Sequence, residues 1–206
     1  MKSAADNAAS RITVELIKGM LNATRREMEA LIARTAMSPF IREKKDFFTA
    51  ILNPAGELVV STSLTLAGNL VDAILQQYPA DTMQDGDLFW YNDPYATGGA
   101  VSHLPDMDFV MPVFAENRLL AFIECWGHLW DIGGAVPGSI SPTASSVFQE
   151  GVMIPPVRVL HGGVRNEEVV RIFTRNSRFP DMLQGDLNSL MAACNLGCKR
   201  LEECAA

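Results

Sequence analysis

The sequence predicts an α+β fold, in which a mixed or antiparallel sheet is covered by long amphipathic helices at the N- and C-terminal ends. Two observations predict it. Apolar residues recur at helical spacing near both ends of the chain, whereas the middle carries short apolar runs separated by turn residues. No internal repeat is present. We therefore expect residues 13–206 to form a single domain behind a flexible N-terminus of residues 1–12.

Helices are predicted where apolar residues recur every three or four positions. The first helix should end near Ser38, because Pro39 disfavours helical geometry in the residue before it. Asn166 is a plausible N-cap for a later helix that has acidic residues in its first turn. The predicted helices are Thr13–Thr35, Leu66–Tyr78, the short Thr143–Phe148, Asn166–Asn176 and Asp181–Glu203.

Strands are predicted for the apolar runs between turn signals. Asn53-Pro-Ala-Gly56 is a turn that joins the first two strands, and Ala115–Arg118 closes a hairpin. Pro155-Pro156 makes the last run an edge strand or an extended segment. The predicted strands are Phe47–Leu52, Leu58–Ser61, Leu88–Tyr91, Phe109–Phe114, Leu119–Cys125 and Val152–Leu160.

The composition excludes several classes of protein. A net charge of −7 argues against a nucleic-acid surface. No run of 18 apolar residues exists, so nothing is expected to span a membrane, and the first ten residues lack the apolar core of a signal peptide. The four cysteines do not form a CxxC-type pair of pairs, and three of them lie in the helical tail. We expect reduced thiols and a cytoplasmic location.

Two of the three histidines lie in the region around the predicted hairpin, and each is followed three residues later by an aspartate. These patches are His103-Leu-Pro-Asp106 and His128-Leu-Trp-Asp131, with Asp93 just upstream on a Gly-rich loop. The hairpin should bring His128 back near His103. Imidazole nitrogens and carboxylate oxygens are the ligands that Zn, Mn or Fe ions prefer. Alternatively, each histidine is a structural residue bonded to the backbone, and Asp131 caps a turn.

Other acidic residues have two readings each. Glu43 and Asp46 precede the first strand, where charges are usually solvated loop residues; the functional reading is that one of them points into the site. Glu150 could also reach a site, although a surface position is the simpler interpretation.

Several motifs in order along the chain resemble the hydantoinase B/oxoprolinase family. The resemblance starts near residue 13 and continues to the end, and its specificity lies in the combination of motifs. The motifs are Arg42-Glu43, Asp46-Phe47, Asn92-Asp-Pro-Tyr95, Ser102-His-Leu-Pro-Asp106, Gly127-His128, Asp131-Ile-Gly-Gly134, Pro137-Gly-Ser139, Phe148-Gln-Glu-Gly151 and Ile154-Pro-Pro156.

The resemblance implies a metal-dependent subunit that works with an ATP-binding partner. The family includes the B subunit of ATP-dependent N-methylhydantoinases, half of 5-oxoprolinase and the large subunit of acetone and acetophenone carboxylases. Its members work with a hydantoinase A-type subunit that uses ATP and Mg to phosphorylate a lactam or enolate oxygen. Carried over to this sequence, the ligands of a divalent Zn, Mn or Fe ion are His103, Asp106 and His128.

Three further acids receive roles in this interpretation. Asp131 would orient a ligand histidine, and Asp93 or Glu43 would complete the coordination or act as a base. The favoured function is hydrolysis of a cyclic amide, a lactam or hydantoin. The alternatives are a ketone carboxylase and a non-catalytic assembly module.

The sequence departs from the family pattern in two ways. Family members commonly show a second histidine next to the first before Ala-Asp-Ile-Gly-Gly, whereas this chain has Leu129 and Trp130 there. These residues suggest a more apolar pocket, suited to a ketone or an aromatic ring. Family B subunits are also more than twice as long, so the chain resembles their N-terminal portion.

Overall fold

A computed structural model describes residues 4–62 and 69–205 of the chain, with side chains from Ser10 onward in the first helix. Its strands form one sheet in the order β2-β1-β5-β4-β3-β6-β7, and every neighbouring pair is antiparallel. The strands are β1 Phe47–Leu52, β2 Leu58–Ser61, β3 Leu88–Tyr91, β4 Asp106–Ala115, β5 Arg118–His128, β6 Val157–His161 and β7 Val164–Arg165.

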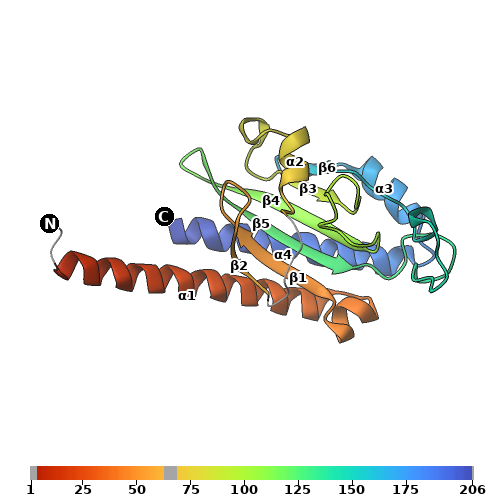
Figure 1. Cartoon of the computed structure of the whole chain (residues 1–206), viewed down its shortest axis with the longest axis horizontal. Helices are drawn as coiled ribbons and strands as arrows, with labels where there is room; N and C mark the ends of the chain where they lie inside the picture. Colours follow the sequence, from red (N-terminus) through yellow and green to blue (C-terminus); the bar gives the residue numbers. More distant parts are fainter. Residues whose placement is uncertain (1–3, 63–68, 206) are drawn as a thin grey trace.

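Two long helices, α1 and α4, lie side by side across one face of the sheet, and the short α2 lies on the other face (Figure 1). The described helices are α1 Ala4–Thr35, α2 Asp72–Gln77, α3 Glu167–Arg175 and α4 Pro180–Ala205, with the short η1 Phe40–Lys44, η2 Ala80–Thr82 and η3 Val147–Gln149 between them. The predicted α+β class, with helices from both ends covering the sheet, is confirmed.

The alternation of side chains along β4 divides the interior into two cores. Met107 and Phe109 point toward α1 and α4 and belong to the larger core. Val110 points to the other face, where it joins Tyr91 and residues of α2 in the smaller core. Because β4 and β5 lie in the middle of the sheet, both of their faces are covered.

The β4–β5 hairpin positions the candidate site. Glu116 and Asn117 both have positive φ angles, of 50° and 59°, which is the geometry of a two-residue turn whose twist matches that of the strands. The strands are longer than predicted, because they continue to Asp106 and His128 at the far end from the turn. These two residues pair directly across the ladder. The end of the hairpin therefore brings together two residues that are 22 positions apart.

Several predicted boundaries were wrong. Helix α1 begins at Ala4 rather than Thr13, and alanine-rich sequence before Thr13 favours that extension. Residues 143–146 are not helical; Ser146 instead caps the short η3. Strand β6 begins at Val157 rather than Val152, so Pro155-Pro156 lies just before it, and it pairs with strands on both sides rather than forming an edge.

Two further predictions concern the starts of helices α2 and α3. The helix predicted for Leu66–Tyr78 is shorter: α2 spans Asp72–Gln77, and residues 69–71 form a turn in which the Asn69 side chain accepts a hydrogen bond from the Val71 N–H. The first part of that prediction, 66–68, lies outside the described residues. Asn166 caps α3 as predicted, by accepting from the Val169 N–H. Within the described ranges, we find no helix with the length and apolar character needed to cross a membrane.

Candidate metal centre

Three predicted ligands meet at the open end of the β4–β5 hairpin. The Asp106 carboxylate lies between two imidazole rings: Oδ2 is 2.9 Å from Nε2 of His103, and Oδ1 is 3.1 Å from Nδ1 of His128. One donor atom from each of these residues lies within 4.8 Å of the others. The segment His103–Asp106 forms a turn, in which the Asp106 N–H donates to the His103 carbonyl. The structure thus brings together the set chosen from the sequence.

The three residues differ in exposure. His128 is only 3% exposed, Asp106 is 15% exposed, and His103 is 42% exposed. The cluster is therefore closed on the side of His128 and open on the side of His103. The Nε2 atom of His128 is buried and has no hydrogen-bond partner among the described residues.

Electrostatics favour a charged pair between His103 and Asp106. The hydrogen bond with Asp106 raises the pKa of His103; burial of the ring opposes this, and the carboxylates of Asp106, Glu150 and Asp46 add to the increase. Burial alone would raise the pKa of Asp106, but the hydrogen bonds with His103 and His128 outweigh it and hold that pKa below its usual value.

Asp46 is the acid that approaches the cluster from β1, and Glu43 is not. The Asp46 carbonyl accepts from the His128 N–H, and its Oδ2 lies 3.8 Å from Nδ1 of His128. Glu43 is exposed on η1. We expected one of these two acids to point into the site and assigned that role to Glu43. The structure places Asp46 there instead. The left-handed residue Lys45, with a φ of 59°, turns the chain between them.

The donor set fits a divalent transition-metal ion. Two imidazoles and one carboxylate, with a second carboxylate close by, match the nitrogen and oxygen ligands that Zn, Mn and Fe ions take. One donor atom from each of His103, Asp106 and His128 lies within 4.8 Å of the others. The residues therefore fit a single ion.

Comparison with known proteins identifies the family. Residues 10–206 match the family model described as hydantoinase B/oxoprolinase. The chain belongs to this family. The caprolactamase subunit beta of Pseudomonas jessenii is 31% identical over 201 residues, which are 96% of this chain and 34% of the relative. The acetophenone carboxylase delta subunit of Aromatoleum aromaticum is 31% identical over 149 residues, 70% of this chain and 21% of that one.

The fold is also found in a solved relative. The crystal structure of an ATP-dependent caprolactamase from Pseudomonas jessenii superimposes with a TM-score of 0.83 at 31% identity, covering 94% of this chain and 34% of that chain. This chain of the hydantoinase B/oxoprolinase family thus spans about a third of the length of these two caprolactamase chains.

Two other predicted site residues lie in local turns. Asp131 accepts from the N–H groups of Gly133, Gly138 and Arg178, and from the Arg178 guanidinium. None of these described contacts involves a histidine, so Asp131 holds the loop after β5, as the turn-capping alternative proposed. Asp93 accepts from the N–H groups of Tyr95 and Ala96, which makes it a turn residue.

An aromatic wall stands beside the buried histidine in this member of the family. The Phe40 ring lies 4.7 Å from the His128 ring and 5.1 Å from that of Trp130, between centroids. Phe40 and Trp130 are both partly exposed. Leu129 and Trp130 follow His128 where family members commonly have a second histidine, so His128 has apolar neighbours in Phe40 and in these two residues.

Sequence reasoning underestimated Glu150 and missed Asp108 and Glu124. Glu150 accepts from the Leu104 N–H at 3.0 Å and holds the turn that carries His103. Asp108 and Glu124 are almost completely buried on the sheet face that also carries Asp106. A charged residue inside each apolar strand was the available signal, since buried acids are rare.

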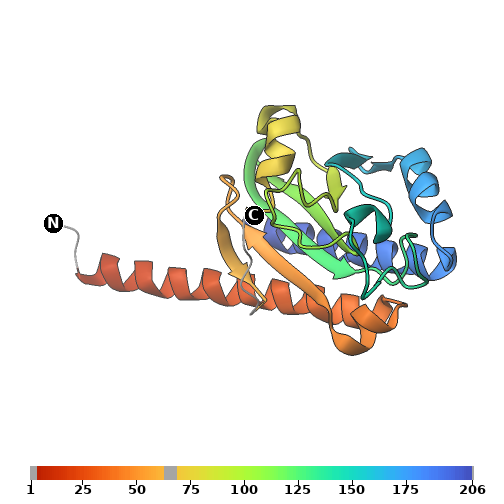
Figure 2. The ribbon, with the colours of Figure 1, turned by 45° about the vertical axis from the view of Figure 1, so that its right-hand side comes forward.

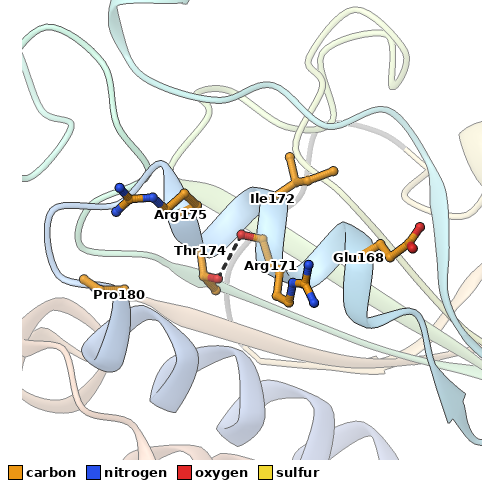
Figure 3. Close-up of a pocket in the computed structure, with 6 residues that line it drawn as sticks. All are labelled: Glu168, Arg171, Ile172, Thr174, Arg175 and Pro180. Carbon is orange, nitrogen blue, oxygen red and sulfur yellow. Dashed lines mark hydrogen bonds between the residues drawn. The ribbon is translucent and has the colours of Figure 1, made fainter.

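The surface hollow in Figure 3 is separate from this cluster. It lies against α3 and the start of α4 and is lined by Glu168, Arg171, Ile172, Thr174, Arg175 and Pro180. It contains none of the cluster residues, so the chemistry of the site is not located there.

Proposed function

We propose that this chain carries the metal centre of an ATP-dependent cyclic-amide hydrolase of the hydantoinase/oxoprolinase type. The supporting observation is the Asp106 carboxylate held between the rings of His103 and His128. The substrate class is a lactam or hydantoin, in keeping with the named caprolactamase relative. ATP and Mg belong to a hydantoinase A-type partner subunit, which activates the amide oxygen.

In this proposal each residue has a defined task. His103, Asp106 and His128 hold one Zn, Mn or Fe ion, and Asp46 lies beside them as a fourth acid. A bound ion of this kind supplies a Lewis acid for a carbonyl or phosphoryl oxygen and lowers the pKa of water toward ~7. In this proposal, Asp46 and Glu150 take the roles that the sequence analysis gave to Glu43, Asp93 and Asp131.

Asp46 and Glu150 take over these tasks for different reasons. Asp46 is half-exposed and close to His128, so it can accept a proton at the mouth of the site. Glu150 keeps His103 in place through the Leu104 N–H, and its negative charge favours a cation at the ring.

A second candidate function is ATP-dependent ketone carboxylation, of the acetone or acetophenone carboxylase type. One observation favours it: the wall of Phe40 and Trp130 beside His128 offers an apolar surface for a ketone or an aromatic ring. An acetophenone carboxylase subunit is also among the relatives. The two functions share the metal centre and differ in the substrate that is activated.

Metal analysis of the purified chain tests the centre directly. We expect about one Zn, Mn or Fe per chain in the wild type after dialysis, and almost none in His128→Ala, because the most buried ligand is lost. Inductively coupled plasma mass spectrometry measures both. His161→Ala is the matched control, since His161 lies on β6 and its side chain is 64% exposed.

The opposite result would favour another class of protein. If the wild type holds no ion after supply of Zn, Mn and Fe, or if His128→Ala retains the full amount, the metal assignment fails. A chain that lacks an ion but still binds a hydantoinase A-type subunit would be a non-catalytic assembly module. With the ion present, ATP-dependent turnover of lactams against ketones, measured with that subunit, separates the two enzyme functions.

A further inference from the structure

His103 is the one member of the three-residue cluster that lies outside the sheet. Asp106 begins β4 and His128 ends β5, so the strand ladder fixes the backbone of both. His103 instead lies on the turn before β4, and its side chain is 42% exposed. The position of its ring therefore depends on the contacts that hold this turn.

The turn is held by contacts from other parts of the chain. The Leu104 N–H donates to Oε2 of Glu150 at 3.0 Å, and the Leu104 carbonyl accepts from Nδ2 of Asn92 at 2.7 Å. The Pro105 carbonyl accepts from the Leu129 N–H at 2.8 Å. These segments meet at the end of the β4–β5 hairpin that lies away from its tight turn (Figure 2). Both backbone polar groups of Leu104 thus have side-chain partners.

The Asn92 side chain is completely buried, and both of its polar atoms have partners. Its Nδ2 also donates to the Val152 carbonyl at 2.9 Å, and its Oδ1 accepts from the Ile154 N–H at 2.6 Å. An amide supplies two donors and an acceptor at once, whereas an ionised aspartate would turn an oxygen toward two carbonyls. Asn92 therefore links the turn before β4 to the segment before β6.

Local turn chemistry does not account for Asn92. The neighbouring Asp93 accepts from residues two and three positions later, as a turn residue does. The Asn92 side chain instead bonds to residues 12, 60 and 62 positions away. It joins the end of β3, the turn that carries His103 and the segment that follows Glu150.

We propose that Asn92 is a positioning residue for the metal centre, which fixes the His103 ring beside Asp106 through the Leu104 carbonyl. This inference rests on the proposed function. The clamp of Asn92 and Glu150 on Leu104 holds Nε2 of His103 2.9 Å from Oδ2 of Asp106. Donor atoms that are already in place lose less freedom when an ion binds, so the clamp raises the affinity for the ion.

Zn binding by the purified full chain tests the role of Asn92 at the centre. Asn92→Ala should weaken Zn binding by about 10–100-fold, the usual loss when the support of a metal ligand is removed. Competition with a chromophoric chelator measures the affinity. At saturating Co²⁺, the visible absorption bands of Asn92→Ala should differ from those of the wild type, because the position of the His103 nitrogen changes.

Hydrogen exchange of the metal-free chain tests the clamp independently of any ion. In Asn92→Ala, the amides of Leu104 and Asp106 should exchange at least about tenfold faster, whereas amides in the middle of β4 should keep their protection. In the wild type, the Nδ2 protons of Asn92 should exchange at least about tenfold more slowly than those of Asn188, which is exposed on α4. NMR measures both rates.

Control variants separate this role from general destabilisation. Asn166→Ala removes the cap of α3, which lowers stability without touching the turn, and it should bind Zn like the wild type. Asn92→Ser keeps a short hydroxyl donor and replaces Asn92→Ala if that variant does not fold. It should show the same two effects at smaller size.

The possible failures are distinguishable. Wild-type Zn affinity in the Asn92 variants overturns the positioning role, whether or not the amides of the turn exchange faster. Rapid exchange of the Asn92 Nδ2 protons in the wild type overturns the clamp. A wild type that binds no Zn overturns the proposed function itself, and with it the role of Asn92 at the centre.

Discussion

Asp106 and Asp108 lie two residues apart on β4, on the same face of the sheet, yet their surroundings differ. Asp106 sits at the end of the strand, where the rings of His103 and His128 face its two oxygens. Asp108 is 1% exposed and lies close to the equally buried Glu124 of β5. Oδ1 of Asp108 and both carboxylate oxygens of Glu124 accept no hydrogen bond from any other described residue. One carboxylate is thus fully partnered and the other is not.

The two carboxyl groups therefore have opposite pKa shifts. Hydrogen bonds with the histidines outweigh burial and hold the pKa of Asp106 below its usual value. Burial raises the pKa of both Asp108 and Glu124 well above their usual values; the charge of Asp106 adds to the increase at Asp108, and the charge of Asp108 adds to the increase at Glu124. The hydrogen bond between the two groups lowers the pKa of Asp108 and raises that of Glu124. The contrast shows that partners, and not position on the strand, decide whether a buried acid carries charge.

The largest expected effect concerns metal content. Asp106→Asn removes the charge shared by the two histidines and should abolish retention of the ion, whereas Asp108→Asn should keep about one ion per chain, because Asp108 has no histidine partner. Mass spectrometry of both variants after dialysis measures this. Equal loss in the two variants would mean that Asp108 also belongs to the centre.

A smaller effect is expected on stability. The folded-state pKa values of Asp108 and Glu124 are raised above 3.8 and 4.5, so their contribution to stability is complete below these values and is lost as the pH rises. Glu124→Gln removes one ionisation and should raise the free energy of unfolding at pH 8 by about 1–3 kcal/mol. Urea unfolding between pH 5 and pH 8 should show a flatter dependence than in the wild type.

Glu168→Gln is the control for this experiment, because Glu168 is exposed on α3. It should leave the pH dependence of the wild type unchanged. A Glu124→Gln variant that loses stability at pH 8 would show instead that the ionised pair has a favourable partner.

The smallest effect is on the titration of His103. In the metal-free chain its pKa is raised above 6.5, chiefly by the hydrogen bond with Asp106, so its contribution to stability is present below 6.5 and is lost as the pH rises through the folded-state value. Asp106→Asn should lower the midpoint of the titration measured by NMR, and Asp108→Asn should leave it close to that of the wild type. A midpoint that is the same in Asp106→Asn and in the wild type would contradict the pairing.

Much of the fold could be predicted because it depends on local pattern. The hairpin around Ala115–Arg118, the strand Phe47–Leu52 and the cap at Asn166 each follow from turn chemistry and periodicity over a few residues. The helix boundary near Thr13 was wrong because the helix propensity of the alanine-rich residues before it outweighed the missing apolar pattern. The strand boundary near Pro155 was wrong because pairing with β3 decided where β6 begins.

The cluster of His103, Asp106 and His128 was also within reach of the sequence. Two HxxD patches that flank a hairpin must return to the same end of it, since antiparallel strands bring back the chain to its starting edge. The residue types then predict a nitrogen and oxygen donor set for a metal ion. The resemblance to the family then selected Asp106, and not Asp131, as the carboxylate ligand.

Only the tertiary structure decided which other acids lie near the cluster and which lie elsewhere. Asp46 faces His128 because β1 pairs with β5 in one particular register, and Asp131 turns away because Arg178, 47 residues later, supplies its partners. Asp108 and Glu124 became a buried pair through the register of β4 on β5. Such contacts depend on which distant segments meet and at which residue, and no short sequence pattern encodes that choice.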